Sequence, residues 1–183
     1  PTVFLQPADG AGWLWPYHGV RTAEGLFLFL LQIEPAEGPA GFGFKLVATW
    51  LGKVINPDEP PERWNVSQQK IPWGHERPLF GSSVLLQGDT CYIYGTVDEA
   101  AGGVMVKHMI VARVPAEKLG DFSAWRFFAG GDWVAEADRA VAVQVTVAHG
   151  QRQAYVLDGA LNREVLALHV HRYPPRAERQ QRR

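Results

Sequence analysis

The sequence predicts an all-β fold made of repeated antiparallel units, and three observations support this prediction. Runs in which large apolar residues alternate with small or polar ones, as in half-buried strands, recur along the chain. The runs return in the same order at intervals of about 60 residues, which is typical of a repeat protein. Short polar or Gly-containing turns separate them, at 23–25, 37–41, 87–89, 99–103 and 149–151.

The first unit is expected over residues 12–66, and it contains three predicted strands closed by Trp64. Because short turns join neighbouring runs, we expect each strand to pair antiparallel with the next one. The strands are the apolar runs "LWPYHGV" from Leu14, "LFLFLLQI" from Leu26 and "FKLVATWLGKV" from Phe44.

The second unit, over residues 76–134, repeats this order. Its segment 121–134 is predicted to be the outermost strand with its connection, and 115–122 could hold one helical turn. Cys91 is the only cysteine and lies in an apolar strand, so we expect a core residue and not a reactive thiol. The strands are "LFGSSVLL" from Leu79, "CYIYGTVD" from Cys91 and "VKHMIVARVP" from Val106.

The third unit is expected over residues 138–172. No outer strand with a Trp follows it, because the chain continues into a basic tail, 173–183, which we expect to be solvated. The predicted strands are "AVAVQVTV" from Ala140, "QAYVLDGA" from Gln153 and "VLALHVHRYP" from Val165.

Meanders that repeat at a fixed period are typical of propeller blades, so the sequence predicts a partial β-propeller of about three antiparallel blades. A sandwich or a barrel also places strands at regular intervals, but neither explains why strand triplets repeat. Closed propellers have four to eight blades, so three blades would leave open strand edges that pair readily with other strands. We therefore expect either a homodimer, in which a second copy covers the edges, or a truncated part of a longer chain.

Five segments extend this prediction to a family: "GWLWPYHGV" (12–20), "FGSSVLL" (80–86), "YIYGT" (92–96), 110–134 and "AYVL" (154–157). In this order they resemble a bacterial family of five-bladed β-propellers of uncharacterised function, itself similar to arabinanase- and levansucrase-type glycoside hydrolases. The resemblance implies a carbohydrate ligand and an extracellular or periplasmic location. Such a family would begin with a further blade that carries an acidic inner-strand motif and would continue past residue 172; the sequence has neither.

The predicted inner strands, 14–20, 78–86 and 140–148, contain no Asp or Glu. Glycoside hydrolysis needs two carboxyl groups across the scissile bond, and the resemblance places such groups on inner strands. Whether the chain is an enzyme therefore stays open, and it is glycoside-hydrolase-like at most. Glu76, just ahead of the second inner strand, is the carboxylate to test as an acid.

The inner strands and the approach to the second one offer neutral polar, basic and aromatic side chains. Such groups suit a sugar or small polar ligand, because they pair with hydroxyls while ring faces cover C–H surfaces. We predict binding without competent hydrolysis, with Trp73 exposed near the channel mouth; the alternative is a structural or interaction module that oligomerises through open blade edges. The same residues could also satisfy one another near the axis. The predicted ligand-binding residues are Tyr17, His18, Trp73, His75, Arg77, Ser82, Ser83 and Gln144.

Charge and hydropathy exclude other partners. The net charge is −1, and the last twelve residues contribute +4, which leaves −5 for the remainder and argues against nucleic-acid binding. No apolar run approaches the roughly 20 residues of a membrane span. His169 and His171 share a face of one predicted strand and could bind zinc with His149, but no ligand cluster accompanies them. We therefore predict no metal and no cofactor.

Overall fold

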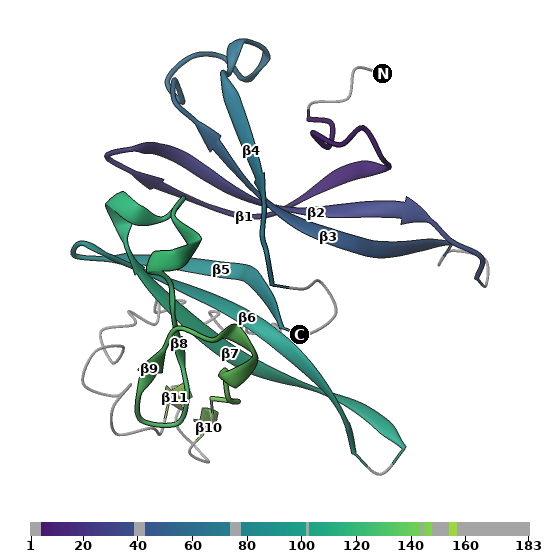
Figure 1. Cartoon of the computed structure of the whole chain (residues 1–183), viewed down its shortest axis with the longest axis vertical. Coiled ribbons are helices and arrows are strands. Elements are labelled where there is room, and N and C mark those ends of the chain that lie inside the picture. Colours follow the sequence, from purple (N-terminus) through teal and green to yellow (C-terminus); the bar gives the residue numbers. More distant parts are fainter. Residues whose placement is uncertain are drawn as a thin grey trace, which may run out of the picture. The chain divides into compact units, whose positions relative to one another are not determined.

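A computed structural model describes residues 5–38, 43–73, 78–101, 103–143, 145–147 and 154–156 (Figure 1). The chain divides into two compact units, residues 1–143 and 144–183. The described residues form antiparallel sheets of four, five and two strands, with short 3-10 turns in some connections and no α-helix. The predicted all-β class is confirmed, and no sheet in the described part of the chain closes on itself.

The first sheet is an antiparallel meander whose strand order follows the chain. The three apolar runs expected in this region correspond to its first three strands. The fourth strand follows Trp64, so the sheet extends beyond the predicted boundary at residue 66. The strands are β1 (Trp13–Thr22), β2 (Gly25–Pro35), β3 (Phe44–Val54) and β4 (Val66–Lys70), with the turn η1 (Pro61–Arg63) before β4.

The second sheet repeats this meander and adds a short fifth strand. The 121–134 segment, predicted as one outer strand with a connection, forms two short strands. The turns η2 (Ala116–Lys118) and η3 (Phe122–Ala124) lie where one helical turn was expected, and η4 (Ala137–Arg139) follows the sheet. The strands are β5 (Leu79–Gln87), β6 (Thr90–Ala101), β7 (Val104–Pro115), β8 (Arg126–Phe128) and β9 (Trp133–Val134).

The first strands of the two sheets, β1 and β5, are bulged at equivalent positions. In β1 the pairing with β2 shifts between Pro16 and His18, just after the position opposite Leu30. In β5 the pairing with β6 shifts between Phe80 and Ser83, just after the position opposite Gly95, which lies 65 residues beyond Leu30. Because bulges re-aim side chains and increase local twist, their recurrence at one register position indicates a structural repeat.

The core of residues 1–143 lies between the two sheets, whose first strands, β1 and β5, are in contact. Trp125 is fully buried there, and its Nε1–H donates to the Leu119 carbonyl at 3.0 Å. Cys91 is also fully buried, as expected, and burial raises the pKa of its thiol to about 11. Other large members of this core are Phe27, Phe29, Leu51, Phe80, Ile93, Ile110 and Phe127.

A polar network ties the segment before β1 to the first sheet. Gln32, with only 1% of its surface exposed, accepts a hydrogen bond from Trp50 Nε1 at 2.8 Å and donates to Asp9 Oδ1 and to the Ala11 carbonyl, each at 2.9 Å. Leu5 packs against the same small apolar cluster as Trp50. Burial of an amide is favourable here because each of its polar atoms has a partner.

Within residues 144–183, β10 (Val145–Val147) and β11 (Ala154–Val156) form an antiparallel pair. They lie within two of the runs predicted for the third repeat. The third predicted strand, from Val165, the tail 173–183 and His149, His169 and His171 are outside the described residues. None of the described residues belongs to a helix long and apolar enough to cross a membrane.

Candidate functional site

The predicted ligand-binding residues fall on three parts of the chain. Tyr17 and His18 are on β1, and Ser82 and Ser83 are on β5. The remaining described residue, Trp73, lies between β4 and β5. Outside the described residues are His75, Glu76, Arg77 and Gln144.

His18 links strand β1 to strand β5. Its side chain is exposed, and its Nδ1 accepts a hydrogen bond from the Val84 amide at 3.2 Å. β5 is an edge strand of its sheet, so this amide has no neighbouring strand on that side to receive its hydrogen. The imidazole therefore satisfies a main-chain donor at the seam between the sheets.

The other predicted polar residues on β1 and β5 make different contacts. Tyr17 is the extra residue of the β1 bulge and packs, half-buried, against the core. Ser82 lies in the bulge of β5, and its Oγ donates a hydrogen bond to the Tyr94 carbonyl of β6 at 3.1 Å. Ser83 is exposed and precedes Val84 directly. Of the described members of the predicted set on β1 and β5, His18 and Ser83 are thus the exposed ones.

The expectation that Trp73 is exposed is wrong. The residue is half-buried, with ring centroids 5.5 Å from Phe122, 5.2 Å from Trp125 and 5.0 Å from Phe127. Its Nε1 is buried and has no hydrogen-bond partner among the described residues. The physical reason is that the Ile71 amide still pairs with the Thr49 carbonyl at 2.9 Å, so the chain stays beside the first sheet and Trp73 enters the aromatic cluster of the core.

Sequence reasoning missed an exposed aromatic pair. Trp15 on β1 and Phe44 on β3 have ring centroids 4.8 Å apart at an interplanar angle of 69°. Their exposed fractions are 38% and 37%, although both are large apolar residues in strands. The only sequence signal is the alternation of Trp13 and Trp15, because contact with Phe44 depends on the register of three strands.

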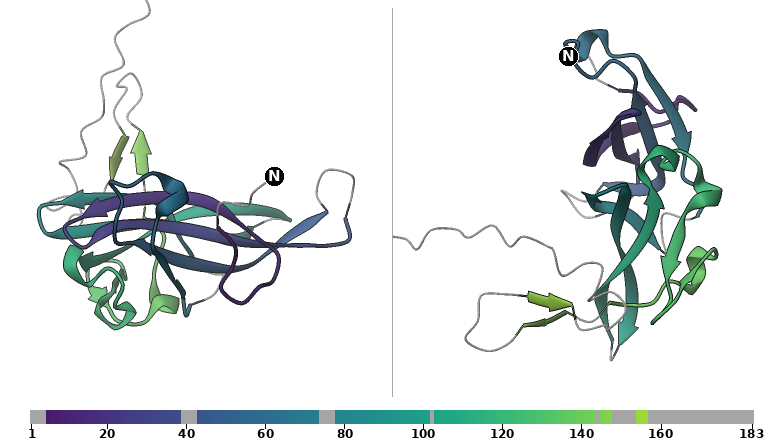
Figure 2. Two further views of the ribbon diagram at one scale, coloured as in Figure 1. Left: turned by 90° about the horizontal axis from the view of Figure 1, so that it is seen from above. Right: turned by 90° about the vertical axis from the view of Figure 1, so that its left-hand side faces the viewer.

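The pair lies at the end of the first sheet where the β2–β3 hairpin extends past its neighbours. β1 pairs with β2 only as far as Ile33, whereas β2 and β3 stay paired to Pro35 and Phe44. Figure 2 shows this hairpin reaching beyond the rest of the sheet. Phe44, opposite Pro35, therefore has no fourth strand to cover it, because β4 pairs with β3 only from Trp50 onwards.

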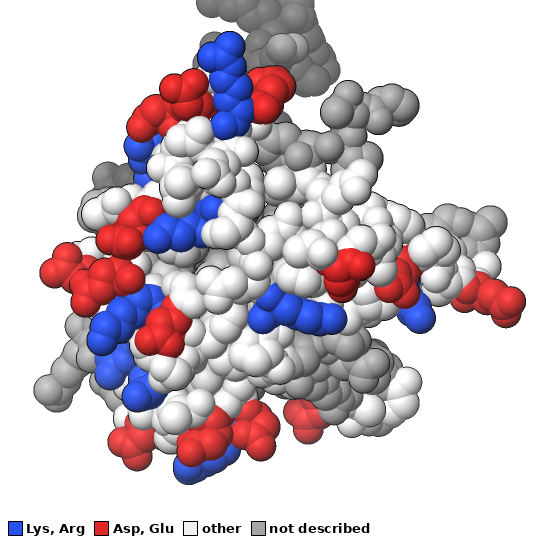
Figure 3. All heavy atoms as spheres, turned by 45° about the horizontal axis from the view of Figure 1, so that its top comes forward, with Lys and Arg blue, Asp and Glu red and all other residues white. Residues whose placement is uncertain are grey.

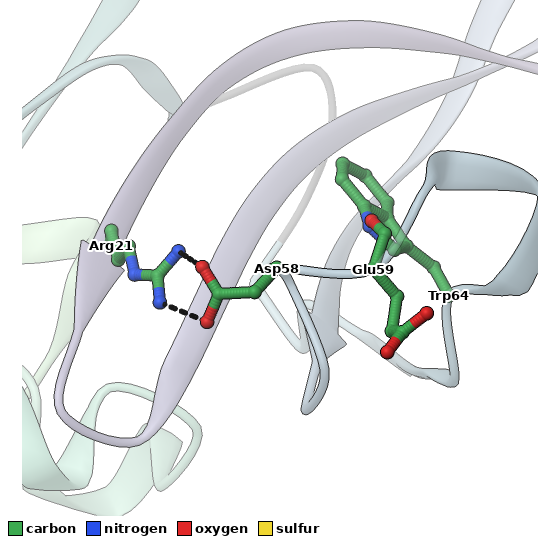
Figure 4. Close-up of polar contacts among 4 residues, drawn as sticks. All are labelled: Arg21, Asp58, Glu59 and Trp64. Carbon is green, nitrogen blue, oxygen red and sulfur yellow. Dashed lines mark hydrogen bonds and ion pairs between the residues drawn. The ribbon is translucent and has the colours of Figure 1, made fainter.

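The opposite end of β1 is fixed by an ion pair. Arg21 donates two hydrogen bonds to the Asp58 carboxylate, at 2.9 and 2.8 Å (Figure 4). The hydrogen bonds and charge of Arg21 lower the pKa of Asp58, and Asp58 raises the pKa of Arg21. In the same β3–β4 connection, Trp64 Nε1 donates to the Glu59 carbonyl at 2.8 Å. Trp64 therefore orders a loop, and it is not an outer-strand residue that closes the predicted repeat over 12–66.

Charges are mixed on one face of the described surface. Basic and acidic side chains alternate over the face drawn in Figure 3, with no continuous patch of either sign. β1 and β5 together contain one charged side chain, Arg21, and that charge is paired with Asp58. The described residues contain no group of three or more His, Cys, Asp or Glu side chains that could hold a metal ion.

Comparison with known protein families gives a match over most of the chain. Residues 2–160 match the model of a family described as a domain of unknown function (DUF5005). No curated protein matches the chain. The match spans both described sheets of the first unit, including β1, β5 and the aromatic pair.

Proposed function

The chain belongs to this family of domains of unknown function, and from that premise we propose that it is a carbohydrate-binding module that does not hydrolyse its ligand. The observation on which the proposal rests is the exposed pair of Trp15 and Phe44. Two large aromatic rings left accessible side by side cost solvation free energy, and such surfaces commonly serve as binding sites.

The geometry of the pair suits a sugar. The C–H face of a pyranose or furanose ring is apolar and stacks on an aromatic face, while its hydroxyls need polar partners at the rim. At an interplanar angle of 69°, Trp15 and Phe44 offer two surfaces that meet at a steep angle. One sugar ring can then contact the face of one side chain and the edge of the other.

The absence of carboxylates from β1 and β5 supports binding without turnover. Both strands are fully described, and neither contains Asp or Glu. Cleavage of a glycosidic bond needs one carboxyl group as proton donor and a second as base or nucleophile. The resemblance to glycoside hydrolases accordingly implies a carbohydrate ligand for this chain and not their chemistry.

We further propose that the two sheets of the first unit are neighbouring blades of a propeller. Three features support this: both sheets are meanders in chain order, their inner strands are in contact, and the bulges occupy one register position. In a propeller the first strand of each blade lines the channel and ligands bind at its mouth, which supports a ligand site on β1.

Binding can be tested by affinity electrophoresis in gels that contain arabinan, levan, xylan or cellulose derivatives, followed by calorimetry with the retarding polymer. We expect retardation by at least one polymer, and a loss of affinity of about tenfold or more for Trp15→Ala and for Phe44→Ala. Leu86→Ala is the matched control, because Leu86 is 39% exposed on β5, an inner strand like β1. Retardation by none of the polymers, or equal losses in all three variants, would contradict the proposal.

A second candidate function is self-association through a strand edge. β6 and β7 pair over their whole length, but β5 reaches β6 only as far as Thr96, and β8 reaches β7 only at Ala112 and Arg113. The part of this hairpin beyond Thr96 therefore lacks a neighbouring strand on the β6 side within the described residues. Light scattering on a size-exclusion column distinguishes a monomer of 20.3 kDa from a homodimer of twice that mass.

A further inference from the structure

The bulge in β1 places His18 on the same face of the first sheet as Trp15. Trp15 lies opposite Leu31 and His18 lies opposite Phe29, and alternate residues of a strand such as Phe29 and Leu31 share one face. In a regular strand, positions 15 and 18 would point to opposite faces. Because Tyr17 is the extra residue, Trp15 and His18 stand on one face, with their backbone positions about 7 Å apart along the strand at ~3.3 Å per residue.

The hydrogen bond from Val84 also determines what His18 can do. A neutral imidazole has one accepting nitrogen and one donating nitrogen, and Nδ1 is here the acceptor. The ring hydrogen is therefore on Nε2. No partner for Nε2 is found within the described residues, and the side chain is exposed, so this N–H is available as a donor to a ligand.

The charges of the inner strands indicate the class of ligand. Arg21 is the only cation on β1 and β5, and both of its bonded amino groups are already used by Asp58. An acidic sugar would therefore meet no unpaired cation along these two strands. A neutral sugar needs only a hydrogen-bond donor for a ring or hydroxyl oxygen, which Nε2 of His18 supplies.

Resting on the carbohydrate-binding function proposed above, we infer that the ligand is a neutral oligosaccharide of at least two sugars that runs along β1. One sugar stacks on the Trp15–Phe44 pair, and the next accepts a hydrogen bond from Nε2–H of His18. The two side chains also lean to different sides of β1, Trp15 towards Phe44 on β3 and His18 towards Val84 on β5, so the two contacts are assigned to successive sugars.

The inference predicts a dependence of affinity on ligand length. We would titrate the protein with neutral arabino-, fructo-, xylo- and cello-oligosaccharides of one to six sugars, and follow tryptophan fluorescence and heat. Affinity should rise about five- to tenfold between one sugar and two or three. His18→Ala should remove this rise and leave the affinity for one sugar unchanged, whereas Trp15→Ala should weaken every member of the series.

His18→Gln is the matched variant for the hydrogen bonding. Its Oε1 can accept from the Val84 amide while its Nε2 donates, so this variant should restore most of the length dependence. Equal affinities for one and three sugars, or tighter binding of an oligogalacturonate than of any neutral series, would overturn the inference and leave the proposed function standing. Binding of no sugar at all would remove the proposed function itself.

A spectroscopic measurement on the unsubstituted protein avoids any effect of substitution on folding. In long-range 15N–1H spectra of the imidazoles at neutral pH, His18 should show the tautomer with its hydrogen on Nε2, and this resonance should shift when a disaccharide or longer ligand is added. The tautomer with its hydrogen on Nδ1, or a resonance unmoved by a ligand that quenches Trp15, would contradict the assignment.

Discussion

The ring of Phe29 lies directly against the backbone of Gly81, and the contact leaves no room for a side chain at residue 81. A Cβ at this position would come within 2.3 Å of Phe29 Cδ1, and Gly81 has φ of +102°. Gly81 lies in the bulge of β5, whereas Phe29 is in β2 of the other sheet and is 1% exposed. Gly81 therefore lets β5 approach the core side chains of the first sheet.

Gly81→Ala should destabilise the first unit by about 2–4 kcal/mol, because the methyl group adds a clash to an unfavourable backbone conformation. The free energy of unfolding from urea titration, followed by tryptophan fluorescence, checks this. Gly88→Ala is the control: Gly88 also has positive φ, at +57°, but nothing lies within 4 Å of its Cβ position. We expect about 1 kcal/mol there, and equal losses at the two sites would refute the packing argument.

Gln32→Leu should cost about 2–4 kcal/mol, because it leaves the buried Trp50 Nε1 without an acceptor and releases the Asp9 carboxylate. The segment that contains Asp9 should also become more sensitive to limited proteolysis. Gln69→Leu provides the comparison, since Gln69 is exposed on β4 and makes no hydrogen bond with its side chain to any described residue. Wild-type proteolysis rates in the Gln32 variant would show that the network does not hold this segment.

The Arg21–Asp58 pair predicts a pH dependence of stability. The pKa of Asp58 is lowered in the folded state from an ordinary value of 3.8, so its contribution is fully present above pH 3.8 and is lost as pH falls through the lower, folded-state pKa. Asp58→Asn should therefore lower the urea midpoint at pH 7, and this difference should shrink as the pH falls below 3.8. A difference that stays constant as the pH falls, or one insensitive to salt at pH 7, would show that the substitution acts by another route.

Cys91 should react with thiol reagents only after unfolding. Burial raises the pKa of its thiol to about 11, so at pH 8 almost none of it is the reactive thiolate, and the side chain is fully buried. We expect one equivalent of a chromogenic disulfide reagent to react in guanidinium and almost none within minutes under native conditions. Fast native reaction would mean that the strand pair β6–β7 opens readily around Cys91.

Most strands within residues 1–143 were predictable because their apolar residues alternate with small or polar ones. The runs from Leu26 and Cys91 bury their apolar residues in the common core, as their patterns indicate. The strand β4 was not predicted, because "VSQQK" has one apolar residue and owes its conformation to pairing with β3. The same strand carries the first sheet past residue 66, the last residue of the first predicted repeat.

The candidate site was less accessible to sequence reasoning. His18 was identified as a binding residue from its type and strand, but its shared face with Trp15 depends on a bulge that alternation alone does not reveal. Trp73 was expected outside, yet its neighbours Phe122, Trp125 and Phe127 come from a distant part of the chain. The contact of Trp15 with Phe44 likewise crosses the intervening strand β2.

The most direct test of carbohydrate binding is a 15N–1H NMR titration of the protein with the polysaccharide fragment that retards it in gels. If the sugar binds along β1, the largest shifts occur at the Trp15 indole N–H and the Phe44 amide, followed by resonances of His18, while the amides around Leu86 remain unmoved. Shifts centred away from β1 and the start of β3, or no shifts with any neutral oligosaccharide, would contradict it.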